Sequence, residues 1–152
     1  MARNISTSGI NELKIHDNIS DSDILLYYRA PTTAERNGYH NMAIQRKGRK
    51  IRFRQPEARL HYGLKILSGF REGDFVRDVN GRPEPFSSDS GSPAYLPSWK
   101  DEIEKGAADL VMLLAAHVFD SSAEIDEPEE DEDEAGAAGD DAPGNSEETS
   151  RQ

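Results

Sequence analysis

The sequence contains no cysteine among its 152 residues. Disulfide bonds, thiolate zinc sites and cysteine nucleophiles are therefore excluded, and a reducing compartment suits the chain. The longest apolar stretch, 107–119, includes Asp109 and His117 and falls short of the roughly 20 residues that a membrane span needs. The N-terminus also lacks the apolar run of a signal peptide. We therefore expect a cytoplasmic protein.

Motifs for catalysis and metal binding are missing as well. The serines at 87–92 lack the GxSxG turn of a nucleophilic serine, and the acidic run 129–134 lacks the glycine of a calcium-binding loop. The histidines have neither metal-ligand spacing nor an HExxH pattern: His16, His40, His61 and His117. We therefore expect no enzyme activity, no cofactor and no metal site.

The acidic residues are unevenly distributed along the chain. Fourteen of the 29 lie in residues 120–152, where only Arg151 opposes them. This segment has a formal net charge of −13 and the rest of the chain +2, which together give the −11 of the whole. A segment so charged, with no aromatic residue, buries too little apolar surface to offset its ordering entropy. We therefore expect a disordered acidic tail over 120–152.

The rest of the chain is long enough for one domain with a modest core. We expect a single, mainly α-helical domain over 10–119 with minor β content, after a flexible N-terminus at 1–9. The clearest helix start is at Thr32, because Thr32 and Glu35 have the spacing of a capping box. The helix is expected to span about 33–47, where basic residues and a following glycine are typical of a C-terminus.

Two more helices are predicted. One runs from Pro56 to about Gly69, because proline suits a first helical turn and glycine a helix end. The last runs from Trp99 to Phe119 after a Ser98 cap, since apolar residues recur there at three- and four-residue spacing.

Three shorter segments keep more than one interpretation. The apolar stretches at 10–15 and 24–28 fit either a strand or a short helix. The alternation of charged and apolar residues in 50–54 fits a strand with Ile51 and Phe53 facing inward, or a linker.

Residues 71–97 are rich in proline, glycine and serine. A structureless loop of this length is unusual in a compact domain. Either the segment orders when a partner binds, or it packs onto the domain through Phe75, Phe86, Tyr95 and Leu96.

A dense run of basic residues begins near the end of the first predicted helix. Clustered cations bind phosphates, and Phe53 and Tyr62 offer rings for stacking on bases. Segment 46–59 therefore suggests a small nucleic-acid-binding adaptor regulated by the acidic tail. A protein partner, the tail itself or a solvated strand edge explains the same charges. The candidate polyanion-binding residues are Arg46, Lys47, Arg49, Lys50, Arg52 and Arg54.

The broad apolar face of the last helix fits a core helix or an amphipathic docking helix that binds a protein partner. The sequence does not separate core from contact positions. The candidates for both roles are Tyr28, Arg29, Leu60, Tyr62, Trp99, Ile103, Leu110 and Leu114.

The stretch 27–36, together with Tyr39 and 58–63, resembles small tail-morphogenesis proteins of tailed bacteriophages and prophages. Its apolar–Arg–x–Pro–Thr–x–x–Glu pattern, Tyr28 to Glu35, is similar to the start of some phage tail-assembly chaperones. The helix that begins at Trp99 resembles the last helix of such proteins. The resemblance covers about residues 10–119.

This resemblance implies a mostly helical, non-enzymatic chaperone that binds tape-measure and tail-tube proteins in the host cytoplasm. We therefore expect a phage or prophage tail-assembly protein that binds other tail proteins through an apolar helix face. The alternative is the nucleic-acid-binding adaptor.

Overall fold

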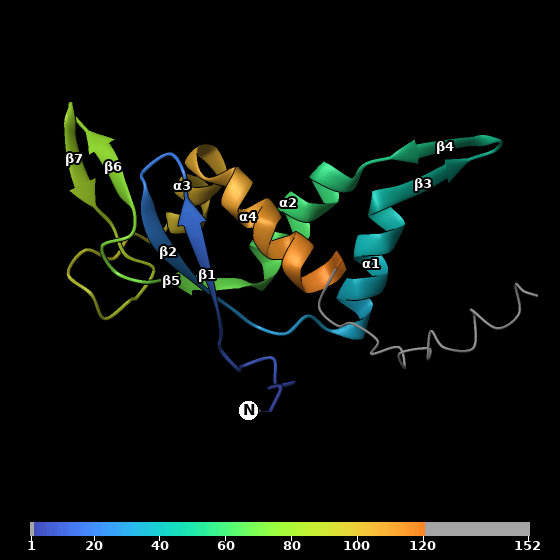
Figure 1. Cartoon of the computed structure of the whole chain (residues 1–152), viewed down its shortest axis with the longest axis horizontal. Helices are drawn as coiled ribbons and strands as arrows, with labels where there is room; N and C mark the ends of the chain where they lie inside the picture. Colours follow the sequence, from blue (N-terminus) through green and yellow to red (C-terminus); the bar gives the residue numbers. More distant parts are fainter. Residues whose placement is uncertain (1, 121–152) are drawn as a thin grey trace, which may run out of the picture. The chain divides into compact units, whose positions relative to one another are not determined.

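The computed structural model of the chain describes residues 2–120. The two apolar stretches that fitted either a strand or a short helix pair as antiparallel strands of one sheet (Figure 1). They form β1 (Asn11–Asp17) and β2 (Ser22–Tyr28), and β5 (Leu67–Phe70) pairs with the other side of β2. In β1, Leu13 and Ile15 pack against the core while their sequence neighbours point to solvent. This alternation is the pattern of a strand with one buried face.

Helices cover one side of this sheet, and two short hairpins complete the described part of the chain. The prediction of a mainly α-helical domain is wrong, because residues 2–120 contain seven strands in three sheets beside the helices. The helices are α1 (Thr33–Ala43), α2 (Gln55–Ile66), α3 (Trp99–Gly106) and α4 (Ala108–Ala115), followed by a π-helical turn, Ala116–Asp120.

The start of α1 confirms the predicted capping box. The Glu35 backbone N–H donates to Thr32 Oγ1 at 3.1 Å, and the Thr32 N–H donates to Glu35 Oε1 at 3.0 Å. The predicted end is wrong, because the helix stops at Ala43. Ile44 is extended, with φ −128° and ψ 106°, and starts a strand that takes the place of the last predicted turn.

Helix α2 confirms a helix after Pro56, although it ends at Ile66 and leads directly into β5. Gly63 lies inside this helix, where glycine lowers helix stability. The structure explains its presence, since a Cβ at this position would lie 2.7 Å from Val111 Cγ1 on α4. Gly63 therefore permits α2 and α4 to pack closely.

The last predicted helix is broken into two. Ala107 has φ −139° and ψ 33°, so α3 ends after Gly106 and α4 starts at Ala108. Ser98 makes no side-chain capping bond. The final π-helical turn is tied down by Asp120, which accepts hydrogen bonds from the Tyr39 hydroxyl at 2.9 Å and from Arg59 Nη2 at 3.0 Å. Asp120 therefore belongs to the folded unit, whereas the rest of the predicted disordered tail lies outside the described residues.

Residues 71–97 contain the hairpin of β6 (Val76–Val79) and β7 (Arg82–Pro85). Phe86 is buried, and Phe75 and Leu96 pack partly against the core. Tyr95 stays more exposed. Of the two interpretations of this segment, packing onto the domain is therefore the one that the structure confirms.

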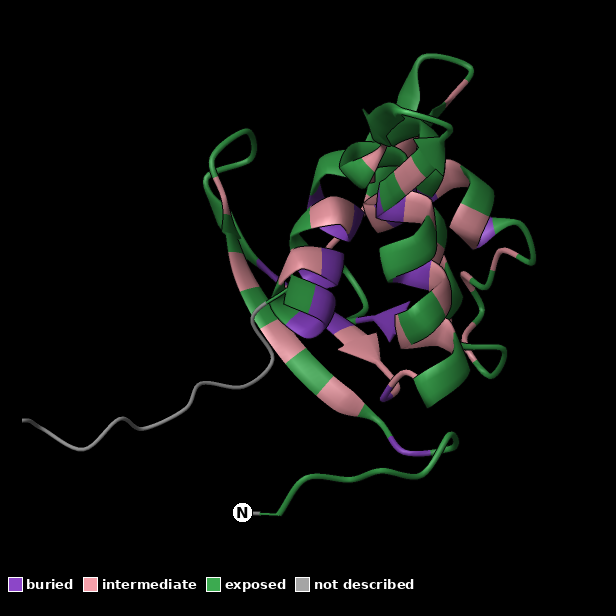
Figure 2. Cartoon of the chain, turned by 90° about the vertical axis from the view of Figure 1, so that its right-hand side faces the viewer, coloured by how far each residue is buried: buried purple, intermediate pink, exposed green. Residues whose placement is uncertain are grey.

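The core lies between the sheet and the helices. The buried residues of the helices face inward in Figure 2, while their outer faces are exposed. The buried core residues come from β2, β5 and every helix. They include Ile24, Leu26, Tyr39, Ile66, Phe70, Trp99, Ile103, Val111, Leu114 and Phe119.

Candidate functional site

The basic run forms a two-stranded hairpin that projects from between α1 and α2 (Figure 1). Its strands are β3 (Ile44–Lys47) and β4 (Lys50–Phe53), and we call residues 44–54 the arm. Strand was one of the two interpretations for 50–54, but we expected the first half of the arm to be the end of a helix. The pairing partner of β4 was therefore missed.

Local chemistry explains why the chain leaves helical geometry at this point. Ile44 is β-branched and favours a strand. Gly48, at φ +61°, occupies the first of the two linking positions, where a type II′ hairpin turn needs glycine. The base is closed by a hydrogen bond from the Arg54 N–H to the Ala43 carbonyl oxygen at 2.7 Å. A glycine between two charged, alternating segments was the signal that could have identified the hairpin.

The strand register divides the arm into two faces, because residues paired across two strands point to the same side. Ile44 pairs with Phe53 and Arg46 with Ile51, which gives the apolar face of the arm. Gln45 pairs with Arg52 and Lys47 with Lys50, which gives the cationic face. All residues of these two faces are exposed except Gln45, which is half-buried.

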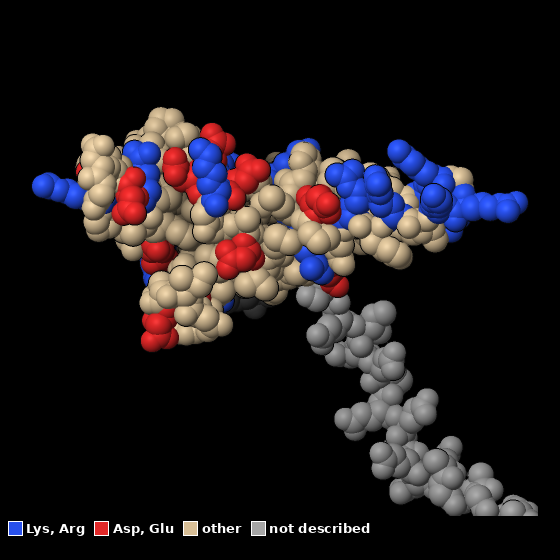
Figure 3. Space-filling model, turned by 90° about the horizontal axis from the view of Figure 1, so that it is seen from above, with Lys and Arg blue, Asp and Glu red and all other residues tan. Residues whose placement is uncertain are grey.

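The positive charge of the arm is not neutralised within the described residues. All six candidate polyanion-binding residues lie in the arm, and no acidic residue occurs between Glu35 and Glu57. None of the six forms an ion pair with another residue of the range 2–120. Figure 3 shows the result, a cluster of Lys and Arg side chains over the arm.

The arm also exposes large apolar side chains. Phe53 is 74% exposed, Ile44 56% and Ile51 49%. The prediction that Ile51 and Phe53 face inward is therefore wrong, because no element of the described chain packs against the hairpin on that side. Phe53 has a free ring face for stacking. Tyr62 is half-buried, its ring packs against Phe119 with centroids 6.0 Å apart, and Lys65 Nζ lies over the ring at 5.4 Å from the centroid.

Most of the candidate partner-binding residues have structural roles. Leu110 and Leu114 on α4 and Trp99 and Ile103 on α3 are buried in the core. The core interpretation of this apolar face is therefore confirmed, and these four side chains are not accessible to a partner in this structure. Leu60 is half-buried and borders a shallow hollow beside Leu64.

Arg29 links three elements through one guanidinium. Its Nη1 and Nη2 donate to the two carboxylate oxygens of Glu35 at 2.7 Å each, and Nη2 also reaches the Lys65 carbonyl oxygen at 3.3 Å. These bonds join the end of β2 to α1 and α2. The Arg29 hydrogen bonds, which favour the charged carboxylate, lower the pKa of Glu35 from 4.5 to about 2.

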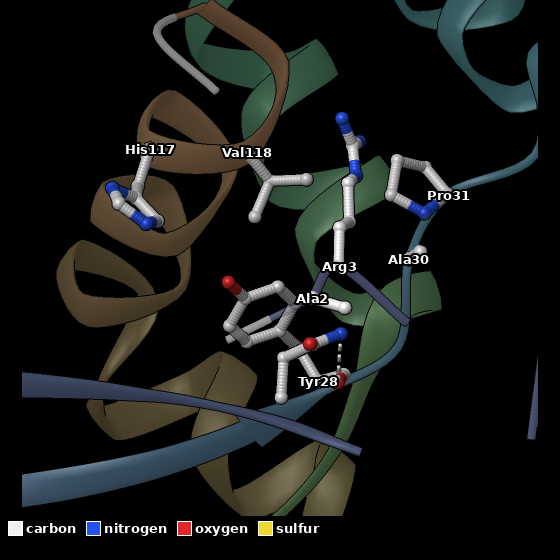
Figure 4. A pocket seen from close by; sticks show the side chains of 8 residues that line it. Ala2, Arg3, Tyr28, Ala30, Pro31, His117 and Val118 are labelled. Atoms are coloured by element: carbon white, nitrogen blue, oxygen red, sulfur yellow. Dashed lines mark hydrogen bonds between the residues drawn. The ribbon is translucent and has the colours of Figure 1, made fainter. Parts of the chain in front are cut away.

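Tyr28 lines a hollow of about 360 Å³ beside the π-helical turn. Its ring points toward the segment of His117 and Val118, and Asn11 Nδ2 donates to the Tyr28 carbonyl oxygen at 3.5 Å (Figure 4). The polar groups at this hollow include a phenol, an imidazole and the Arg3 guanidinium. Within the described residues, no hydrogen bond joins Tyr28 to His117. The two side chains are therefore not arranged as a nucleophile and its base.

The range 2–120 holds no group of three or more His, Asp or Glu side chains arranged to bind a metal ion. In the same range, no helix has the length and apolar character needed to cross a membrane.

Comparison with protein-family models, with curated proteins and with solved structures gave no match for this chain. We therefore infer function from the geometry of the arm and of the surfaces around it.

Proposed function

We propose that the chain is a non-enzymatic nucleic-acid-binding protein that contacts the phosphate backbone with the cationic face of the arm. The observation that carries this proposal is the arm itself, an exposed ribbon whose six basic residues form no ion pair with any other residue of the range 2–120. Such cations release condensed counterions when they meet phosphates, and that release supplies binding free energy.

The shape of the arm supports the same proposal. The major groove of B-DNA, about 12 Å wide, admits a two-stranded β-ribbon. Lys47, Lys50 and Arg52 share one face of the arm, so they meet one nucleic-acid surface together. Phe53 on the other face is free to contact bases or a groove wall.

The test measures binding of the full chain to a fluorescently labelled DNA duplex as a function of salt. Each phosphate contact contributes about 0.9 to the slope of log K against log salt concentration. The triple variant Lys47→Gln/Lys50→Gln/Arg52→Gln should therefore reduce the slope by about 2–3 and weaken binding at every sequence.

The matched control is Lys14→Gln/Arg82→Gln/Lys105→Gln, which removes the same charge from exposed positions outside the arm. It should change the slope little. Equal losses in both triple variants would show a net-charge effect and would refute a site on the arm.

The tail-assembly role stays a second proposal, favoured by the exposed apolar face of the arm, which suits a protein partner. The residues that carry the resemblance have local roles here, since Thr32 and Glu35 cap α1 and Arg29 pairs with Glu35. A tail-assembly partner would contact Ile44, Ile51 and Phe53 in place of the buried helix face. Loss of co-purified protein from Phe53→Ser, with DNA binding retained, would support it.

A further inference from the structure

An apolar groove lies outside the site described above. It has a volume of about 410 Å³, within the range of roughly 300–1,000 Å³ that small-molecule pockets occupy. It lies between the β1–β2 turn, β6 and the junction of α3 and α4. Its floor includes Phe75, Phe86 and Ile103, and two exposed apolar residues, Ile19 and Val76, stand at its border.

The groove has an acidic rim. Four carboxylates line it against two cations, Arg77 and Lys105, which leaves a formal net charge of −2. Asp74 is committed to the fold, because it accepts from the Leu25 N–H at 2.9 Å and from Arg71. Glu102 lies 3.8 Å from Arg77.

The other two carboxylates, Asp17 and Asp109, face no cation at ion-pair distance within the described residues. Asp17 is committed to the β1–β2 turn, because it accepts hydrogen bonds from the Ile19 N–H at 3.2 Å and from the Ser20 N–H at 3.1 Å. Asp109 is exposed and is therefore available to a basic partner. A segment that fits this groove therefore carries both apolar side chains and positive charge.

The arm has this chemistry. Its apolar face combines Ile44, Ile51 and Phe53 with Arg46, and Arg49 at its tip adds a second charge nearby. Within the described residues, the groove has no apolar occupant and has one uncommitted carboxylate, Asp109, without an ion-pair partner. Within the same range, the arm has no apolar partner and its cations form no ion pair. The two surfaces are complementary in both respects.

The arm projects at one end of the described unit, and the β1–β2 turn and β6, which line the groove, lie at the other end (Figure 1). The arm therefore does not reach the groove of its own chain. We propose that the apolar face of the arm docks into the groove of a second copy of this chain. This contact is head to tail, and it generates rings or open filaments rather than a two-fold dimer. The cationic face stays on the outside of such an assembly.

The test is sedimentation velocity of the nucleic-acid-free full chain, over a range of concentrations and at low salt. We expect oligomers larger than dimers. An arm variant, Ile51→Ser/Phe53→Ser, and a groove variant, Val76→Ser/Asp109→Lys, should each weaken association about tenfold or more, because each removes apolar contact from one side of the interface. All four positions are exposed, so the fold should be retained.

Mixing the two variants gives the sharpest readout. The groove variant still has an intact arm and the arm variant an intact groove, so a mixture should form a dimer and nothing larger. This dimer distinguishes a head-to-tail contact from pairing of two arms, in which the groove variant alone would assemble like the unmodified chain. That outcome, or a monomeric unmodified chain at every concentration, would overturn the proposal.

Self-association and nucleic-acid binding can be tested independently with one variant. Lys47→Gln/Lys50→Gln/Arg52→Gln changes the opposite face of the arm, so it should lose DNA binding while oligomers persist. Loss of both properties in the triple variant would contradict docking through the apolar face.

Discussion

The β3–β4 and β6–β7 hairpins share one local design and differ in attachment. Each pairs two four-residue strands across a two-residue turn, and each turn contains at least one residue with a positive φ. Gly48 has φ +61° in the first hairpin, and Asn80 and Gly81 have φ +55° and +80° in the second. An Asn-Gly pair with both φ values positive fits a type I′ turn.

The residues that flank the strands differ. Phe75 and Phe86, on either side of β6–β7, pack around Phe70 with ring centroids 4.8 and 5.4 Å away. Arg77 adds a 3.8 Å ion pair to Glu102 on α3. The arm has no such aromatic anchor, and its charged residues have no ion-pair partner in the described chain. The residues that flank the strands of a hairpin, and not the strands themselves, therefore determine whether the hairpin packs against the core.

The largest expected difference between the two hairpins is in their aromatic residues. Phe86→Ala should lower the free energy of unfolding by about 3–5 kcal/mol, because it leaves a cavity beside Phe70 and Phe75. Phe53→Ala, at an exposed position, should change it by less than about 0.5 kcal/mol. Urea denaturation of both variants measures the difference. Similar losses would show that the arm is packed in solution.

The second prediction concerns Arg29, which has an ion-pair partner in Glu35, unlike the arginines of the arm within the described residues. The lowered pKa of Glu35 means that its ion pair with Arg29 stabilises the fold fully above pH 4.5, and that this contribution is lost as the pH falls to about 2. Its size is at most about 3 kcal/mol.

Glu35→Gln should therefore remove the contribution of Glu35 to the pH dependence of stability in this window, while glutamine still serves the capping box. The free energy of unfolding, measured between pH 2 and pH 7, tests this. The control Glu57→Gln, at an exposed position in α2, should keep the dependence. If the two variants have the same profile, the Arg29–Glu35 pair contributes nothing.

Third, the turn glycines should differ in their effect on stability. Gly81→Ala forces alanine into a left-handed conformation and should cost about 1–2 kcal/mol, because the β6–β7 hairpin is attached to the core. Gly48→Ala has the same local strain, but the arm opens without disturbing the core, so global stability should change little. Thermal unfolding of both variants is the measurement, and equal shifts would contradict independent opening of the arm.

The smallest expected effect lies within the arm. Lys47 and Lys50 are directly opposite, and like charges in this arrangement destabilise a hairpin. Lys50→Glu should increase the stability of the arm by about 0.2–1 kcal/mol, seen as slower amide hydrogen exchange in β3 and β4. Exchange in β6 and β7 should not change. Unchanged exchange in the arm would indicate that the cationic face is already neutralised.

Local signals predicted where three of the helices begin. The Thr32–Glu35 capping box, Pro56 at the start of α2 and the apolar spacing after Trp99 all mark helices that the structure contains. The strands were harder, because β4 and β7 are four residues long and too short for periodicity to identify. Asn80-Gly81 was a usable hairpin signal that the Pro- and Gly-rich composition obscured.

The candidate site was partly predictable. The six basic residues of the arm are visible as a run in the sequence. The sequence does not show that Phe53 is exposed and Leu114 is buried, because both are apolar residues in amphipathic segments. Their difference depends on which other elements pack against them.

The sequence alone determined where charge is concentrated, where α1 begins and which chemistries the chain lacks, because these depend on residue identity and near-neighbour spacing. Only the tertiary structure decided that the last apolar helix is interior while the arm stays uncovered. Burial is set by contacts between residues distant in sequence, such as Gly63 with Val111 and Tyr39 with Asp120. Short-range patterns carry no information about those contacts.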